Sequence, residues 1–213
     1  METDSAHSLR GLLFIAIAGF AFIWISVGRH FGLGSEVAVM QETSSFLIDD
    51  FSSEDGVFAV GTAWRMFTDQ VMGGVSEAAS GVETVAGRRC LRLRGRVSLK
   101  NNGGFIQVAL SLSRGSRPFD ASEFKGVRVW VRGNGKTYHI HLRTTETRLP
   151  WQYYSAGFDA GAQWSSVELP FSRFKPENLR VKLDTRNLER IAIVAIGEEL
   201  EADIAVSRLE FFR

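Results

Sequence analysis

The sequence predicts an all-β sandwich preceded by one N-terminal hydrophobic helix, and three observations support this fold class. Beyond residue 45, short runs rich in β-branched and aromatic residues are separated by clusters of Gly, Asn, Asp and Pro, which is typical of strands joined by turns. Several of these runs alternate apolar and polar residues, as strands with one buried face do. No segment beyond residue 45 keeps a helical apolar period for more than about three turns.

Nine strands are expected in chain order. The alternation is clearest near residue 130, where Val127, Val129 and Val131 share one face and are expected in the core. Tyr138 and Leu142 belong to a second alternating run, whose apolar positions are also expected to face inward. The expected strands are 46–51, 90–97, 105–112, 126–131, 138–143, 153–158, 165–169, 188–196 and 204–212.

Connections between the expected strands carry their own signals. The segment 133–137, Gly-Asn-Gly-Lys-Thr, ends like a phosphate-binding P-loop, but Trp130 stands where that motif requires its first glycine. A tight β-hairpin is predicted instead, because Gly-Asn-Gly supplies the positive φ angles of two-residue loops. Residues 171–175 are expected to form one short turn, and 178–187 an extended surface connection.

Two histidines are the candidates for metal binding or catalysis within the folded part. His139 and His141 stand two apart on an expected strand, so their rings point to the same side and could offer two nitrogens to Zn²⁺. No Cys/His cluster accompanies them, and Arg143 lies on the same face, so a solvated strand face is favoured. A Gly-x-Ser-x-Gly elbow is absent, and we predict no catalytic residue, metal or cofactor.

Acidic residues and the single cysteine each allow two interpretations. Asp49, Asp50 and Asp55 could contribute to an oxygen-rich Ca²⁺ site, but a simple turn after the first strand is favoured because EF-hand spacing is absent. Cys90 shares a face of an expected strand with Arg92 and Arg94, whose charges could make it a reactive thiol. A half-exposed strand residue without a role is the favoured alternative.

Composition bounds the domain count and the partners. Hydrophobic residues make up 45% and charged residues 23% of the 213-residue chain, as in ordinary globular proteins. Without its N-terminal segment the chain keeps roughly 170 residues, enough for one well-buried core. The formal net charge of +1 offers no excess of cations for phosphate contacts, so we predict no nucleic-acid binding.

The N-terminal segment carries the membrane signal. Residues 11–27, GLLFIAIAGFAFIWISV, contain no charge and are bounded by Arg10 and Arg29. This length suits a short transmembrane anchor, which is favoured over a removed signal peptide. The expected organisation is a tail at 1–10, the anchor at 11–27, a linker at 28–45 and the β-sandwich at 46–213. We therefore expect a single-pass membrane protein, and the charges leave the side of the globular domain open.

Four ordered motifs resemble the complex I intermediate-associated protein 30 family. They are Trp64 to Ser76 with its paired glycines, Gly133 to Thr144, Pro150 to Tyr154, and Trp164 to Phe171. The resemblance extends from about residue 46 to residue 212. It implies a galactose-binding-like jelly-roll β-sandwich, and a chaperone-like role like that of the mitochondrial members, which assist the assembly of respiratory complex I.

The resemblance and the aromatic content together suggest a partner-binding surface. The resemblance implies that segments 64–76 and 102–105 shape this surface, and the alternative is that they only fix loop geometry. Trp151 and Tyr153 are also predicted to belong to this surface, because Arg148 and Pro150 mark a loop before them and flat aromatic rings give large contact areas. The candidate partner-binding residues are Trp64, Asp69, Met72, Gly73, Gly74, Ser76, Asn102, Gly104, Phe105, Trp151 and Tyr153.

Three functions remain open at the level of sequence. The favoured hypothesis is a non-enzymatic, membrane-tethered module that binds protein subunits or intermediates of a membrane complex of the NADH:ubiquinone oxidoreductase type. A carbohydrate-binding module of the cell envelope is the alternative, because the expected fold hosts many functions. An enzyme that uses His139 or His141 is the least favoured.

Overall fold

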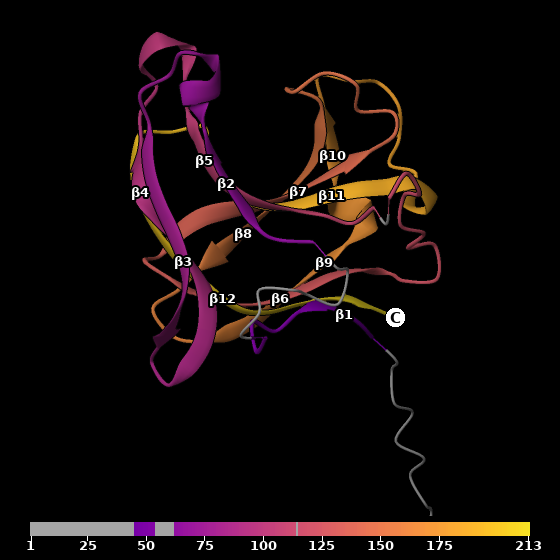
Figure 1. Cartoon of the computed structure of the whole chain (residues 1–213), viewed down its shortest axis with the longest axis horizontal. Helices are drawn as coiled ribbons and strands as arrows, with labels where there is room; N and C mark the ends of the chain where they lie inside the picture. The colour runs from indigo at the N-terminus through magenta and orange to yellow at the C-terminus, as the bar shows by residue number, and fades with distance from the viewer. Residues whose placement is uncertain (1–44, 54–61, 114) are drawn as a thin grey trace, which may run out of the picture. The chain divides into compact units, whose positions relative to one another are not determined.

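A computed structural model describes residues 45–53, 62–113 and 115–213, which form two packed antiparallel sheets. Sheet A has the order β3-β4-β12-β6-β9, with β1 also paired to β12, and sheet B has the order β10-β8-β7-β11-β5-β2. Figure 1 shows β1, β6 and β12 in one layer and β7, β8 and β11 in the other. The expected all-β sandwich is confirmed.

The element bounds follow the sequence pattern closely in the central strands. β12 is long enough to pair with β4 through its first half and with β1 through its second half, while β6 follows its other edge. The strands of sheet A are β1 (Phe46–Asp49), β3 (Glu77–Val85), β4 (Arg88–Val97), β6 (Gly126–Gly133), β9 (Ser165–Pro170) and β12 (Leu200–Phe212). The strands of sheet B are β2 (Arg65–Thr68), β5 (Phe105–Ser111), β7 (Lys136–Thr144), β8 (Tyr153–Ala160), β10 (Lys175–Glu177) and β11 (Leu188–Ile196). Four short 3₁₀ helices complete the list: η1 (Asp69–Met72), η2 (Lys100–Asn102), η3 (Phe171–Arg173) and η4 (Thr185–Asn187).

The core lies between the sheets and contains the alternating positions that the sequence indicated. Val127, Val129 and Val131 of β6 are fully buried against Tyr138 and Leu142 of β7, in one hydrophobic cluster. Because the apolar face of each strand points inward, the opposite face of sheet B is free to form a binding surface.

Three strands were not predicted, and each lacks the usual signal. β3 is an edge strand whose residues are mostly exposed, so its sequence shows no apolar alternation. β10 is three residues long, contains Pro176 and lies at the edge of sheet B, where proline is tolerated. β2 occupies the start of the glycine-paired motif, which was interpreted as a loop.

The predicted hairpin at 133–137 is wrong, because β6 and β7 belong to different sheets. The connection crosses between the layers and docks on the β8–β9 turn, where the amides of Gly133 and Gly135 donate to the carbonyl oxygens of Gly161 and Ala160, each at 2.8 Å. Gly135 does adopt a positive φ of 80°, as the sequence indicated. The sequence did not show that the strand after this turn lies in the other sheet.

Cys90 differs from both interpretations offered by the sequence. Its side chain is fully buried, and its Sγ lies 3.4 Å from the carbonyl oxygen of Glu83 on β3. Burial raises the pKa of the thiol, which favours the unreactive protonated form. The residue is therefore a packing group between β3 and β4.

Asp49 and Asp50 form turn hydrogen bonds at the end of β1, as the favoured interpretation expected. Asp50 accepts from the amide and hydroxyl of Ser52 at 3.1 and 2.6 Å, while Asp49 accepts from Phe51 N and Trp64 Nε1, both at 2.7 Å. Asp55 lies outside the described residues. Among the residues that are described, no group of three or more His, Cys, Asp or Glu side chains could hold a metal ion.

The buried Asp49 predicts a titration near pH 6. Burial raises the pKa of this carboxyl group to about 6, so the folded chain binds an extra proton between about pH 4 and 6 and loses stability as pH rises through that window. Because Trp64 Nε1 donates to Asp49, we expect a tryptophan fluorescence change with a midpoint near pH 6. The change should vanish in Asp49→Asn, and its persistence in that variant would assign it to another group.

The predicted anchor at 11–27 and its flanking tail and linker lie outside the described residues, apart from residue 45. Within the ranges that are described, no helix is both long and apolar enough to cross a membrane.

Candidate functional site

Asp69 is the structural centre of the glycine-paired motif. Its side chain is fully buried, and its carboxylate accepts hydrogen bonds from Ser76 N at 2.9 Å, Ser76 Oγ at 2.5 Å and Gly104 N at 2.6 Å. Ser76 Oγ in turn accepts from Ser98 N at 2.9 Å. This network fastens the segment 69–76 to the segment 98–105, two loops that the resemblance had placed on one surface.

The two adjacent glycines of the motif are required for different reasons. Gly73 has a φ of +89° at the end of η1, a conformation that L side chains rarely adopt, but open space surrounds its Cα. Gly74 donates its amide to the carbonyl oxygen of Asp69, and a Cβ there would lie 2.3 Å from the Asp69 carboxylate. Gly73 therefore serves backbone geometry, whereas Gly74 leaves room for the buried carboxylate.

Substitution of Gly74 by alanine should destabilise the chain by about 2 to 4 kcal/mol, because the added methyl group would displace the Asp69 carboxylate from its donors. Gly81→Ala on β3 is the matched control, since open space surrounds that position and its φ is not in the left-handed region. Urea unfolding monitored by tryptophan fluorescence measures both variants. Equal stability of the two variants would contradict the role assigned to Gly74.

Several candidate partner-binding residues support the loops rather than face solvent. Asp69 and Ser76 are fully buried, and Gly74 and Gly104 are buried beside them. Trp64 packs on the core, where its ring lies 6.0 Å from that of Phe51 and its Nε1 donates to Asp49. For these residues the geometry favours the loop-fixing alternative. Asn102 is exposed in the second loop and has a positive φ of 57°.

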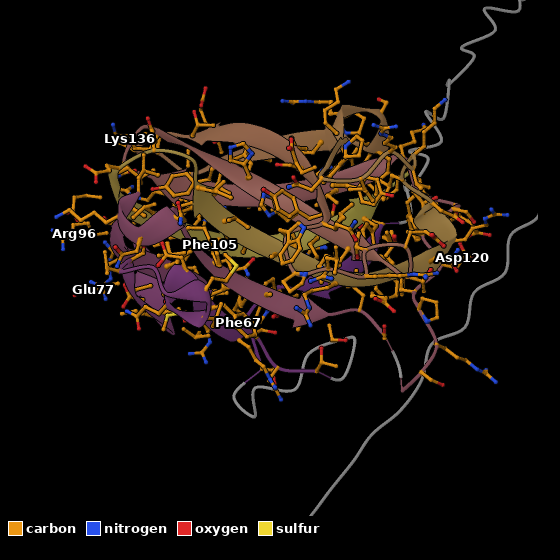
Figure 2. The ribbon with its side chains drawn as sticks, turned by 90° about the horizontal axis from the view of Figure 1, so that it is seen from above. Phe67, Glu77, Arg96, Phe105, Asp120 and Lys136 are labelled. Carbon is orange, nitrogen blue, oxygen red and sulfur yellow. The ribbon has the colours of Figure 1, made fainter. Side chains whose placement is uncertain are left out.

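A cleft of about 260 Å³ lies on the outer face of sheet B, beside these loops. Its apolar floor is formed by Ala192 and Val194 of β11, with Phe67 of β2 and Phe105 of β5 packed against them. Figure 2 labels both phenylalanines, which lie near each other on neighbouring strands. The cleft is lined by Phe67, Val71, Met72, Phe105, Gln107, His141, Arg143, Pro150, Trp151, Tyr153, Asn178, Arg190, Ala192, Val194 and Ile196.

The cleft unites four of the predicted site residues, which are Met72, Phe105, Trp151 and Tyr153. Trp151 is 51% exposed, and the loop that carries it is tied to the segment after β10, since Asn178 Nδ2 donates to Trp151 O at 3.0 Å. Tyr153 stacks on His141 with ring centroids 3.9 Å apart and an interplanar angle of 11°. Two aromatic groups from a loop and a strand thus form one wall.

The predicted solvated face at His139 and His141 is wrong for His141, whereas His139 is half-buried. The rings do point to the same side of β7, but His141 is only 6% exposed and its Nε2 has no hydrogen-bond partner within the described chain. Burial, together with the neighbouring His139, lowers the pKa of His141 to about 3, so its ring is neutral at physiological pH. His139 is engaged elsewhere, with Nδ1 3.0 Å from Ser155 Oγ.

Two arginines complete the cleft, and sequence reasoning did not assign them to a site. Arg143 of β7 and Arg190 of β11 are register partners, so their side chains lie directly opposite each other on the cleft face. Arg143 donates from Nη2 to the carbonyl oxygens of Thr147 and Leu149 at 2.5 and 3.1 Å. The available signal was the alternation in 188–196, whose second face carries Arg190, Ala192 and Val194.

Solved structures with a similar fold include carbohydrate-binding modules. The family 11 carbohydrate-binding module of a Clostridium thermocellum cellulosomal cellulase aligns with a TM-score of 0.60 and 13% identity, over 79% of this chain and 94% of the module. The Clostridium thermocellum module in complex with a beta-1,3-1,4-mixed-linked tetrasaccharide aligns with a TM-score of 0.59 and 13% identity, over 78% of this chain and 94% of the module. At this identity the similarity shows the fold alone.

Sequence comparison gives one curated relative and one family. Endoglucanase 3 of Fibrobacter succinogenes is 26% identical over an alignment 148 residues long; the match covers 62% of this chain and 21%, about a fifth, of the length of that protein. The family model of complex I intermediate-associated protein 30 matches residues 50–203, the part of the chain that carries the Asp69 network and the cleft. The chain therefore belongs to the complex I intermediate-associated protein 30 family.

Proposed function

We propose that the chain is a non-catalytic, membrane-tethered binding module that holds a polypeptide segment of a respiratory membrane complex during assembly. The observation that carries this proposal is the cleft on sheet B, whose floor and rim are both apolar at one end. Membership of the complex I intermediate-associated protein 30 family supports an assembly intermediate of the NADH:ubiquinone oxidoreductase type as the partner.

The exposed rim argues for a polypeptide. Val71 is 70% exposed and Met72 50% exposed, and both line the cleft together with the half-exposed Trp151. Large apolar side chains at exposed positions around a concave floor are typical of protein interaction sites. Sugar hydroxyls would need hydrogen-bond partners, whereas Phe67, Phe105 and Ile196 at this end offer none from their side chains.

The proposed mechanism is holding without covalent chemistry. Val71 and Met72 on η1 would contact apolar side chains of the partner that remain exposed until the next subunit of the complex binds. The Asp69 network keeps η1 in place beside the cleft, so little conformational entropy is lost when the partner binds. The predicted anchor at 11–27 would keep the cleft near a membrane-embedded partner.

Co-purification in native detergent tests this function. The full chain is expected to recover subunits of the respiratory complex, and Met72→Lys should abolish that recovery because it places a charge on the apolar rim. Val82→Lys is the matched control, since Val82 is also exposed, at 41%, but lies on β3 of sheet A. Normal NADH dehydrogenase activity in a deletion strain, with no subunit recovered, would remove the proposal.

A glycan is the second candidate ligand, and the opposite wall of the cleft favours it. The stacked pair of His141 and Tyr153 and the exposed ring of Trp151 form the kind of flat surface on which sugar rings pack. The similar fold of a module solved with a beta-1,3-1,4-mixed-linked tetrasaccharide supports this candidate. Isothermal titration with that tetrasaccharide and with envelope polysaccharides tests it, and absence of heat with all of them would count against it.

A further inference from the structure

We infer that the cleft selects a polypeptide segment in which a carboxylate group stands beside large apolar side chains, and that Arg143 and Arg190 bind that carboxylate. This inference rests on the proposed function and specifies the chemistry of the partner. The occupant is an acidic and apolar peptide segment, identified by the charges at one end of the cleft and the apolar surface at the other.

The first observation is an uncompensated pair of cations. Arg143 and Arg190 lie directly opposite each other on β7 and β11, an arrangement that like charges make unfavourable in a sheet. Across the described ranges neither guanidinium forms an ion pair with a carboxylate; Glu189 attracts Arg143 only at longer range. A register shift between Leu188 and Arg190 brings the two arginines into register.

Two arginines on strands of sheet A are each compensated by two carboxylates. Arg92 of β4 binds Glu83 at 2.8 Å and Asp203 at 2.7 Å, and Arg128 of β6 binds Glu168 at 2.7 Å and Glu210 at 2.6 Å. Unlike Arg92 and Arg128, Arg143 and Arg190 have no carboxylate partner in the described ranges, and both line the cleft. Cations without a carboxylate partner are what an anionic ligand would neutralise.

The second observation is that one guanidinium is already oriented. Arg143 Nε lies 3.2 Å from Thr147 Oγ1, and its Nη2 donates to the carbonyl oxygens of Thr147 and Leu149. These bonds occupy the Nε and Nη2 edge of the Arg143 guanidinium group, and Nη1 has no hydrogen-bond partner among the described residues. Burial and the charge of Arg190 lower the pKa of Arg143, because two nearby like charges disfavour each other.

The third observation is the unpartnered nitrogen of His141. This side chain is more than nine-tenths buried and lines the same cleft. It is the register partner of Ala192 in the floor, and this pair lies two residues along the strands from the pair of arginines. Buried polar atoms are normally hydrogen-bonded, so a ligand group that reaches this end can satisfy one. Because the ring is neutral, it adds a hydrogen bond and no further charge.

The apolar end decides between an acidic peptide and an acidic glycan. Phe67, Phe105 and Ile196 surround the floor and leave no polar side chain at that end except Gln107, among the residues that line the cleft. A peptide can place an apolar side chain there and a Glu or Asp side chain against the arginines, whereas a saccharide would bury hydroxyl groups without partners. The occupant that fits both ends is therefore an acidic peptide with large apolar residues.

Selection from a random library of twelve-residue displayed peptides tests this specificity on the full chain in detergent. We expect enrichment of sequences in which Asp or Glu stands within a few residues of Leu, Phe or Met. The acidic enrichment should disappear on Arg190→Gln and persist on Arg96→Gln, the control at an exposed arginine of β4 outside the cleft. Apolar enrichment without acidic residues, or no enrichment at all, would overturn the inference.

Affinity measurements on the most enriched peptide give the magnitude. Fluorescence anisotropy should show about tenfold weaker binding when its acidic residue is replaced by Gln, and a similar loss on Arg190→Gln with the original peptide. The two changes combined should lose little more than either alone, since both remove the same ion pair. Additive losses would overturn the assignment of Arg190.

Two further outcomes distinguish failure of this inference from failure of the proposed function. Binding of galacturonate oligosaccharides that depends on Arg190, without peptide enrichment, would replace the acidic peptide by an acidic glycan and overturn the inference. Recovery of complex subunits that is sensitive to Met72→Lys but unaffected by Arg190→Gln would leave the proposed function standing and overturn the inference alone.

Discussion

Substitution of Asp69 by alanine should lower the free energy of unfolding by about 3 to 5 kcal/mol, which is the cost of removing one partner from a buried charged network. The substitution leaves Ser76 N and Gly104 N without their acceptor inside the protein and opens a cavity between the two loops. Urea unfolding of the full chain in detergent, monitored by tryptophan fluorescence, measures the loss through the transition midpoint.

Asp159→Ala is the matched control for Asp69→Ala. Asp159 is exposed and accepts one hydrogen bond, from Thr137 Oγ1 at 2.7 Å, so its loss should change stability by less than about 1 kcal/mol. If both aspartate variants unfold at the same urea concentration, the network around Asp69 contributes nothing beyond a surface contact.

The same network predicts the acid side of the stability curve. Burial opposes ionisation of Asp69, but the hydrogen bonds from Ser76, Gly104 and Phe105 outweigh it and lower the pKa of the carboxyl group. The stabilisation is therefore complete above the unfolded-state pKa, about 3.9, and is lost as pH falls through the lower folded-state pKa. Asp69→Ala should not show this part of the acid dependence.

Apolar alternation in the sequence was sufficient to predict the strands at the centre of each sheet. Val127, Val129 and Val131 alternate with polar residues because one face packs in the core, and that pattern is local to the chain. Edge strands such as β3 lack this constraint, since solvent accepts any polar side chain on both faces. Which strands pair was not visible, and for this reason the turn at Gly135 was predicted as a hairpin rather than a crossing between sheets.

The cleft could be predicted only in part, because it is assembled across five strands and three loops. Trp151 and Tyr153 were found from a local signal, a proline-marked loop followed by aromatics. Arg190 and His141 are separated by about 50 positions in sequence, and nothing local shows that β7 and β11 are neighbours. His141 was assigned to solvent because it shares a strand face with Arg143 and has no Cys/His cluster beside it, an argument that fails when the outer face of a sheet is itself concave.

Replacement of Trp151 by alanine should weaken binding of the cleft's ligand about 30-fold, or about 2 kcal/mol, which is the effect of removing an aromatic hot-spot residue. Half of the Trp151 side chain is exposed and the ring lines the cleft, so it can contribute contact area that the free protein does not already use. Folding should be almost unaffected, because the hydrogen bond from Asn178 ends on the Trp151 backbone carbonyl and survives the substitution.

Trp130→Ala separates a binding effect from the general loss of a tryptophan. Trp130 is also partly exposed, but it lies on β6 of sheet A, where its ring contacts the guanidinium groups of Arg128 and Arg208 at 5.8 and 5.5 Å. The control should keep full recovery of complex subunits in native detergent while Trp151→Ala loses it. Trp151 lines the cleft and Trp130 does not. Loss of recovery in both variants, or in neither, would therefore place the partner on another face.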